Sequence, residues 1–161
     1  KLISAAALLL VATLSHAADG KKAAASIPDN TPILMQAEVG SLDKRVEVAY
    51  VCDSQQGKRN VNAMYGIKDG ETAVVQIKVG DQVTPGLWRV MNDTNGKKQN
   101  SYYGEGLTWI TDKASPDTLT KANGKILMQA GKLDGGLPKG DQTILFKDCK
   151  VDSAATKKLN K

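Results

Sequence analysis

The two cysteines of this chain constrain its fold more than any other feature of the sequence. Cys52 stands near the end of an alternating run, VEVAYVCD, and Cys149 ends a second run, TILFKDC, about 100 residues later. Alternation of apolar and polar side chains indicates a β-strand with one buried face. A bridge between the two cysteines would therefore join the first predicted strand to the last, and it requires those strands to be neighbours in space.

The first residues of the sequence predict export. The stretch KLISAAALLLVATLSHA has a basic start, an apolar run and small residues at the cleavage positions, which is the pattern of a secretory signal peptide over residues 1–17. The apolar run is too short for a transmembrane helix, which needs about 20 apolar residues. No cysteine directly follows the cleavage site to carry a lipid. We therefore expect an exported protein that has no transmembrane segment and is not lipidated.

Export decides how the cysteines are interpreted. In an oxidising compartment an even number of cysteines favours a disulfide over a metal site or a pair of free thiols. Cys52 and Cys149 are the only two, so the predicted bridge is Cys52–Cys149. Closing a loop of this length is worth roughly 4 to 5 kcal/mol in the loop-entropy description of the unfolded chain.

Short alternating runs separated by turn signals continue from residue 44 to residue 150. We count eight runs of strand character: VEVAYVCD, NVNAMYGI, TAVVQIKV, GLWRVM, QNSYYG, GLTWIT, KILMQA and QTILFKDC. Turn signals such as KDGE and NDTNGKK lie between them, and no long helical period appears. The sequence therefore predicts an all-β fold, a small antiparallel barrel of about eight strands closed by the disulfide.

The segments on either side of the predicted barrel have a different composition. Residues 18–43 are rich in Ala, Lys, Pro and Ser, which predicts a flexible segment. Residues 151–161 form a basic C-terminal tail that we expect to be disordered. The formal charge of the chain is +5, of which Lys1 lies in the predicted signal peptide and +3 in the terminal stretch KVDSAATKKLNK. Because the rest of the predicted mature chain is nearly neutral, no nucleic-acid partner is expected.

The inventory of reactive side chains argues against an enzyme. His16, the single histidine, lies in the predicted signal peptide, so the mature protein would contain none. This excludes Ser/His/Asp and Cys/His nucleophile systems and most zinc and copper sites. The sequence therefore predicts no catalytic residues, no metal and no cofactor.

Two stretches carry a resemblance to a known family. The segment VAYVCDSQQGKRNVNAMYG and the terminal ILFKDC resemble the adhesin complex protein of Gram-negative bacteria, which is related to the MliC/PliC inhibitors of c-type lysozyme. The resemblance covers about residues 45–149. It implies an eight-stranded barrel, one disulfide, a location in the periplasm or on the outer-membrane surface, and inhibition of host lysozyme alongside a role in adhesion.

The same resemblance implies a lysozyme-binding site. Inhibitors of the MliC type insert a serine and a lysine into the lysozyme cleft, against its catalytic carboxylates. Here the serine segment corresponds to NSYYGEG, which offers Ser101, Tyr103 and Gly104, and the lysine segment corresponds to LTWITDKAS, which offers Lys113. Hydroxyl and ammonium donors suit carboxyl acceptors, and charge-assisted hydrogen bonds are the strong ones.

Two functions stay open at this point. The leading hypothesis is an exported inhibitor that blocks the active-site cleft of c-type lysozyme, which would be its protein partner. The alternative is an adhesin that binds host cells or matrix without inhibiting lysozyme, in which case charge on the basic tail would contribute. Self-association into a homodimer also stays open.

Overall fold

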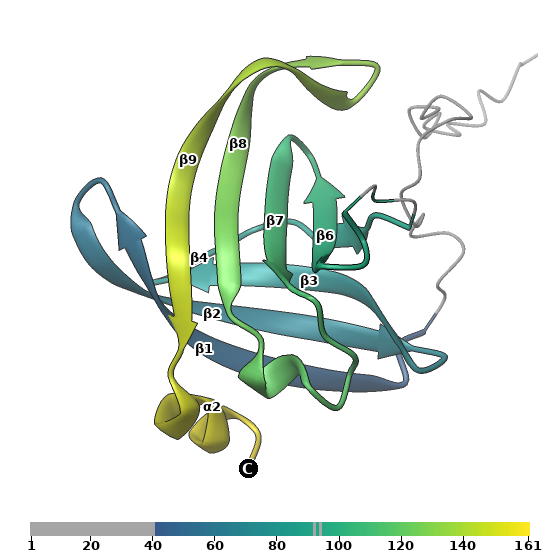
Figure 1. Cartoon of the computed structure of the whole chain (residues 1–161), viewed down its shortest axis with the longest axis vertical. Coiled ribbons are helices and arrows are strands. Elements are labelled where there is room, and N and C mark those ends of the chain that lie inside the picture. Colours follow the sequence, from purple (N-terminus) through teal and green to yellow (C-terminus); the bar gives the residue numbers. More distant parts are fainter. Residues whose placement is uncertain (1–40, 92, 94) are drawn as a thin grey trace, which may run out of the picture.

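Nine β-strands form one continuous antiparallel sheet. The computed structural model describes residues 41–91, 93 and 95–161. Its strands are β1 (Lys44–Ser54), β2 (Gly57–Lys68), β3 (Glu71–Val79), β4 (Gln82–Val83), β5 (Leu87–Arg89), β6 (Gln99–Gly104), β7 (Leu107–Asp112), β8 (Gly124–Asp134) and β9 (Leu137–Val151). In Figure 1, β1, β2 and β3 cross beneath the steeply inclined strands β6 to β9.

Eight of these strands close into a barrel. The hydrogen-bonded order is β2-β1-β9-β8-β7-β6-β5-β3, and an additional pairing of β3 with β2 completes the ring. The two-residue strand β4 pairs with β3 and lies outside this ring. The predicted all-β barrel of about eight strands is confirmed, because each of the eight alternating runs in the sequence supplies one strand of the ring.

Alternation of apolar and polar residues places one face of β1 and one face of β2 in the barrel interior. On β1 the inward residues Val48, Tyr50 and Cys52 are at most 1% exposed, and Val61 and Tyr65 are fully buried on β2. The turn between β2 and β3 has two successive residues with positive φ, the aspartate and glycine of KDGE. Such a turn matches the twist of the strands it joins, which explains why this hairpin is tight.

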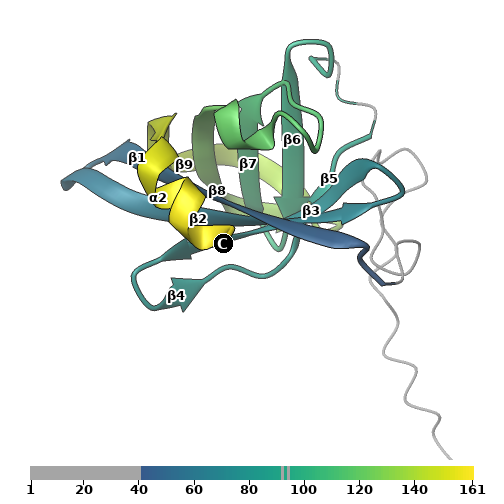
Figure 2. The same cartoon turned by 90° about the horizontal axis from the view of Figure 1, so that it is seen from below.

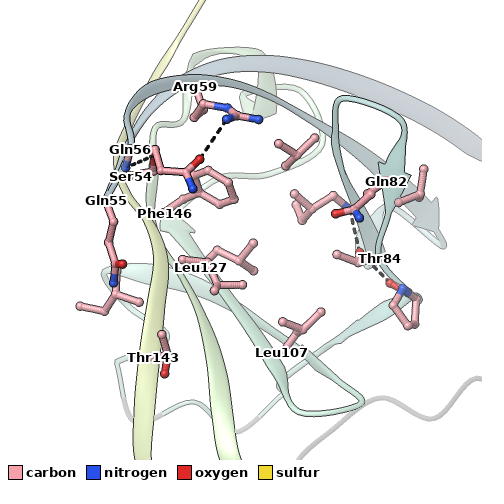
Figure 3. Close-up of a pocket in the computed structure, with 16 residues that line it drawn as sticks. Ser54, Gln55, Gln56, Arg59, Gln82, Thr84, Leu107, Leu127, Thr143 and Phe146 are labelled. Carbon is pink, nitrogen blue, oxygen red and sulfur yellow. Dashed lines mark hydrogen bonds between the residues drawn. The ribbon is translucent and has the colours of Figure 1, made fainter.

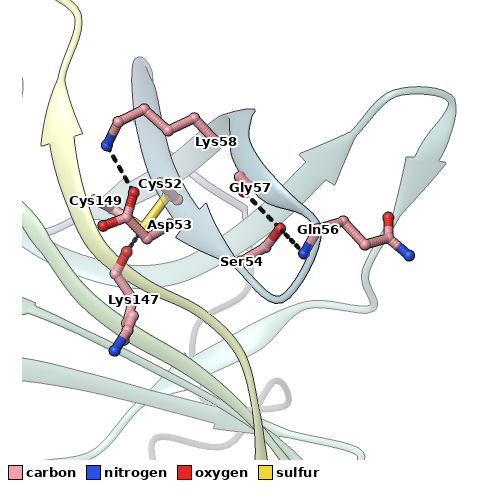
Figure 4. A network of polar contacts seen from close by, with 8 residues as sticks. All are labelled: Cys52, Asp53, Ser54, Gln56, Gly57, Lys58, Lys147 and Cys149. Carbon is pink, nitrogen blue, oxygen red and sulfur yellow. Dashed lines mark hydrogen bonds and ion pairs between the residues drawn. A yellow bond between two sulfur atoms is a disulfide. The ribbon is translucent and has the colours of Figure 1, made fainter.

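The disulfide joins β1 to β9, as the sequence predicts. Cys52 and Cys149 are bonded and fully buried, so the first and last strands of the ring are covalently linked where they pair. A side chain on Gly124 of β8 would collide with the ring of Trp109 and with Cys149, so a glycine there lets the indole lie close to the bridge. Figure 4 shows the bridge beside the turn between β1 and β2.

The two ends of the barrel differ. The connection from β7 to β8 contains the 3-10 helix η1 (Leu119–Lys121). Ala114, Leu119 and Ala122 from this connection belong to the buried core cluster and close one end. The opposite end, where β7 begins at Leu107, is hollowed and lined by side chains from β1 to β4 and from β7 to β9. Throughout, we call these the closed end and the open end.

The expectation of a disordered C-terminal tail is wrong. Strand β9 continues to Val151, and helix α2 (Ser153–Leu159) follows it and lies against β1 (Figure 2). Asp152 caps this helix by accepting a hydrogen bond from the backbone N–H of Ala155 at 2.9 Å. The buried Thr156 hydroxyl accepts from the N–H of Ala49 at 3.0 Å. These contacts satisfy backbone groups that solvent would otherwise have to bind.

Two sequence predictions fall outside the described residues. The signal peptide at 1–17 and most of the flexible segment at 18–43 lie there. Within the described ranges, no helix has the length and apolar character needed to cross a membrane.

Candidate functional site

Ser101 lies on the outward face of β6 beneath the connection between β5 and β6. It is 7% exposed, and its hydroxyl donates to the Asp93 carboxylate. The Gln99 amide donates to both Asp93 Oδ2 and Ser101 Oγ, each at 3.1 Å. Burial alone would raise the pKa of Asp93, but hydrogen bonds from Ser101, Asn95 and Gln99 outweigh it, and the pKa is lowered. The Ser101 hydroxyl is therefore held by a carboxylate of its own chain.

Tyr103 and Gly104 lie toward the other end of the same strand. The Tyr103 hydroxyl donates to the backbone carbonyl of Gly136 in the turn between β8 and β9. A Cβ on Gly104 would lie 2.5 Å from the carbonyl oxygen of Gly86, so only glycine permits the close approach of the chain that precedes β5. In the β6–β7 pairing Gly104 faces Leu107 next to the tight turn. Both residues hold neighbouring segments together.

Lys113 lies at the closed end, directly after β7. Its side chain is exposed, and among the described residues it forms no ion pair. In the β6–β7 register Gln99 lies opposite Asp112 and Ser101 lies opposite Ile110, so Ser101 is in the middle of this hairpin and Lys113 follows its last paired residue. Ser101 is two positions from Tyr103 on the same face of β6. The structure therefore places Lys113 apart from the other three predicted residues.

The backbone around Lys113 is fixed on both sides. The N–H of Asp112 donates to the carbonyl of Asn123 at 2.9 Å. The side-chain amide of Asn100 donates to the carbonyl of Ala114 at 2.7 Å, and the N–H of Ser115 donates to Thr118 Oγ1 at 2.9 Å. A side chain on such a fixed backbone loses less conformational entropy when it binds.

A polar network inside the barrel supports this connection. Asn100 is fully buried, and its carbonyl oxygen accepts from Arg89 Nη2 at 2.7 Å. Arg89 Nη1 also donates to Thr72 Oγ1 at 2.8 Å, and the guanidinium lies 5.3 Å from the centre of the Tyr102 ring. The sequence analysis missed this network. Its one signal was a polar residue, Asn100, at an inward position of an alternating strand.

The residue before Lys113 pairs with a different lysine. The Lys125 ammonium lies 3.8 Å from a carboxylate oxygen of Asp112 and donates to the backbone carbonyl of Lys98 at 3.4 Å. Asp112 is thus paired with Lys125, whereas Lys113 forms no ion pair among the described residues. An unpaired ammonium group can bind a carboxylate or another anion. In the part of the chain that the structure describes, no cluster of three His, Cys, Asp or Glu side chains could hold a metal ion.

Fold and site together define a small disulfide-closed β-barrel with an exposed lysine on a rigidly held connection at its closed end. Residues 46–151, about two thirds of the chain, match the model of the ACP-like domain family, whose type is an adhesin complex protein. The chain therefore belongs to this family. No curated protein matches its sequence significantly.

Proposed function

We propose that this protein inhibits c-type lysozyme by placing Lys113 in the active-site cleft of the enzyme. Membership of the ACP-like family supports the proposal, because the sequence resemblance connects that family with lysozyme inhibition. The observation that carries it is local: Lys113 is an exposed ammonium without an ion pair among the described residues, on a backbone fixed from both sides.

The chemistry of the cleft suits this group. Lysozyme carries two catalytic carboxyl groups, one kept protonated by its apolar surroundings and one ionised. An ammonium inserted between them donates to both, and charge-assisted hydrogen bonds strengthen where water is excluded. Catalysis stops because the cation occupies the place of the sugar.

Ser101 is the secondary contact in this proposal. Its hydroxyl reaches a partner only if the segment carrying Asp93 moves, since Asp93 accepts its hydrogen bond. The Ser101→Ala variant should therefore weaken inhibition less than Lys113→Ala.

Long-range charge does not assist this complex. Both c-type lysozyme and this chain, with its formal charge of +5, are basic, so diffusional encounter gains no electrostatic steering. Affinity has to come from contacts at the acidic cleft. The proposal therefore predicts slow association that added salt accelerates.

The deciding experiment is a cell-wall lysis assay with the mature protein. Wild-type protein should abolish the activity of a c-type lysozyme at stoichiometric concentration and leave a g-type lysozyme unaffected. Lys113→Ala should raise the inhibition constant at least about tenfold. Lys78→Ala is the matched control, because Lys78 is an exposed lysine on β3 away from this site. Full lysozyme activity at micromolar excess of wild-type protein would overturn the proposal.

Adhesion to a host surface is the second candidate function. The observation that favours it is helix α2, on which Lys157 and Lys158 are exposed in the last turn. Deleting the tail would also disrupt β1, so the better variant is Lys157→Glu/Lys158→Glu, which retains Thr156. Cell binding that falls in this variant and at high salt, with lysozyme inhibition unchanged, would identify charge-dependent adhesion.

A further inference from the structure

The open end of the barrel contains a cavity of about 780 Å³. Its inner wall is apolar and comes from strands on opposite sides of the ring: Ile77 and Val79 of β3, Leu107 of β7, Leu127 of β8, and Leu145 and Phe146 of β9. Figure 3 shows Leu107, Leu127 and Phe146 around the hollow, with polar residues at its border. The size lies in the range of small-molecule binding sites, which occur preferentially in the mouths of β-barrels.

An irregularity in β9 increases the apolar lining. The β8–β9 register shifts between Leu127, which faces Phe146, and Met128, which faces Ile144. Leu145 is therefore an extra residue in β9, and a bulge of this kind turns a strand so that successive side chains no longer alternate strictly. As a result three successive residues, Ile144, Leu145 and Phe146, line the cavity.

Two exposed apolar side chains extend the cavity to the surface. Val83 of β4 is 50% exposed and Ile144 is 45% exposed, and both line the cavity. They are among the few large hydrophobic residues that the described part of the chain leaves exposed. An apolar rim around a preformed apolar hollow marks a binding surface, because isolated exposed residues would not converge on one cavity.

The polar border carries one charged group. Among the lining residues Arg59 of β2 is the only one with a charge, and the others at the border are amides or hydroxyls from Ser54, Gln55, Gln56, Gln82, Thr84 and Thr143. The single hydrogen bond of its guanidinium within the described residues goes to Gln56 Oε1 at 3.4 Å, which is long. Most of its donors are therefore available, and a guanidinium matches the geometry of a carboxylate or phosphate.

We propose that the open end binds an aliphatic amphiphile with an anionic head, its chain in the apolar hollow and its head against Arg59. The apolar wall sets the preference for an alkyl chain, and the single cation at the border sets the preference for negative charge. The head group belongs to a free fatty acid or to an anionic lipid, and both offer the same chemistry. This site and Lys113 are at opposite ends of the barrel, so the two proposals stand or fall separately.

Calorimetric titration with dodecanoate, dodecanol and hexanoate tests the proposal. Dodecanoate should bind saturably with one site per chain, dodecanol more weakly, and hexanoate more weakly than either, since each buried methylene contributes to transfer free energy. Arg59→Gln should weaken dodecanoate binding about threefold to fivefold, the range of an exposed ion pair, and leave dodecanol binding unchanged. Lys58→Gln is the control, because Lys58 alternates with Arg59 on β2 and pairs with Asp53.

A second variant tests the apolar part. Val83→Glu should weaken dodecanoate binding about tenfold, because it removes part of the apolar rim and places a second negative charge near the carboxylate of the ligand. Since Val83 is exposed, the fold should tolerate the change. Met91→Glu is the control, since Met91 is an exposed apolar residue that does not line the cavity. Each variant should keep the thermal midpoint and the lysozyme inhibition of the wild type.

Cosedimentation with phosphatidylglycerol vesicles distinguishes the two sources of the head group. Binding to dodecanoate with no binding to vesicles identifies a free fatty acid as the ligand class. Vesicle binding that Val83→Glu weakens identifies a membrane lipid. Absence of saturable dodecanoate binding, or equal affinities in Val83→Glu and Met91→Glu, would overturn the proposal.

Discussion

The buried side chain of Asn100 holds the carbonyl of Ala114 by a hydrogen bond of 2.7 Å, and so fixes the residue that follows Lys113. The same side chain accepts from Arg89 inside the barrel. One fully buried amide thus connects the interior of the barrel to the exposed segment that carries the proposed inhibitory cation. A core residue could therefore influence inhibition without touching lysozyme.

Asn100→Asp separates the two roles of this side chain. A carboxylate still accepts from Arg89, but it has no donor for the carbonyl of Ala114 and repels it. We expect the hydrogen-bonded amides of Asp112 and Ser115, on either side of Lys113, to exchange with solvent about tenfold faster, and inhibition to weaken, while the barrel stays folded. Hydrogen-exchange mass spectrometry and the lysis assay measure both effects. Unchanged exchange in this segment would show that Asn100 does not hold it.

The regular part of this fold could be predicted from the sequence. In a strand that is buried on one face, the buried positions recur every two residues. The inward positions of β1 and β2 follow that period from Val46 to Cys52 and from Val61 to Ile67. The disulfide could be predicted because two cysteines allow one pairing. These signals are local or depend on simple counting, so they do not require knowledge of how distant segments pack.

The contacts that shape the candidate site depend on tertiary packing. Nothing in QNSYYG shows that Asp93 will hold the Ser101 hydroxyl, or that Tyr102 and Tyr103 will both be buried although they point to opposite faces of β6. The outward tyrosine is covered by the turn that contains Gly136, whose position follows from the length of the β8–β9 hairpin. The C-terminal helix was missed for the same reason, since its stability comes from docking on β1.

Loss of the disulfide should destabilise the barrel strongly. Replacing Cys52 and Cys149 together by alanine removes a crosslink across 97 positions, which constrains the unfolded chain by roughly 4 kcal/mol in the loop-entropy description. Urea unfolding of this variant should show a much lower midpoint than the wild type. Because the bridge is fully buried, a reducing agent should act on the native wild type only through unfolding. An unchanged midpoint in the double variant would contradict a stabilising bridge.

Stability should decline at alkaline pH because of tyrosines in the core. The Tyr50 and Tyr65 hydroxyls lie 3.1 Å apart, and Trp109 Nε1 donates to the Tyr65 hydroxyl at 3.0 Å. Burial is the main cause that raises the pKa of both tyrosines above the ordinary value of 10. The folded protein therefore keeps protons that the unfolded chain releases, so the free energy of unfolding is unaffected below pH 10 and falls as the pH rises above it.

Urea unfolding across the alkaline range, with tyrosinate absorbance as a second probe, measures this decline. Tyr50→Phe should give a shallower decline than the wild type, because one of the tyrosines with a raised pKa is removed. If tyrosinate forms fully in the folded protein near pH 10, the buried hydroxyls are accessible and the explanation fails.

Helix α2 should contribute to the stability of the barrel through one buried hydroxyl. Thr156 Oγ1 accepts from the N–H of Ala49 at 3.0 Å, and Asn160 exchanges two hydrogen bonds with the backbone of Glu47. Thr156→Val keeps the shape of the side chain but leaves the Ala49 N–H without an acceptor, so we expect a loss of about 1 to 3 kcal/mol. Lys157→Ala, at the adjacent exposed position, is the control and should unfold like the wild type. Should Thr156→Val match that control in urea unfolding, the helix would rest on β1 without stabilising it, and the basic residues it carries could be removed together with the helix.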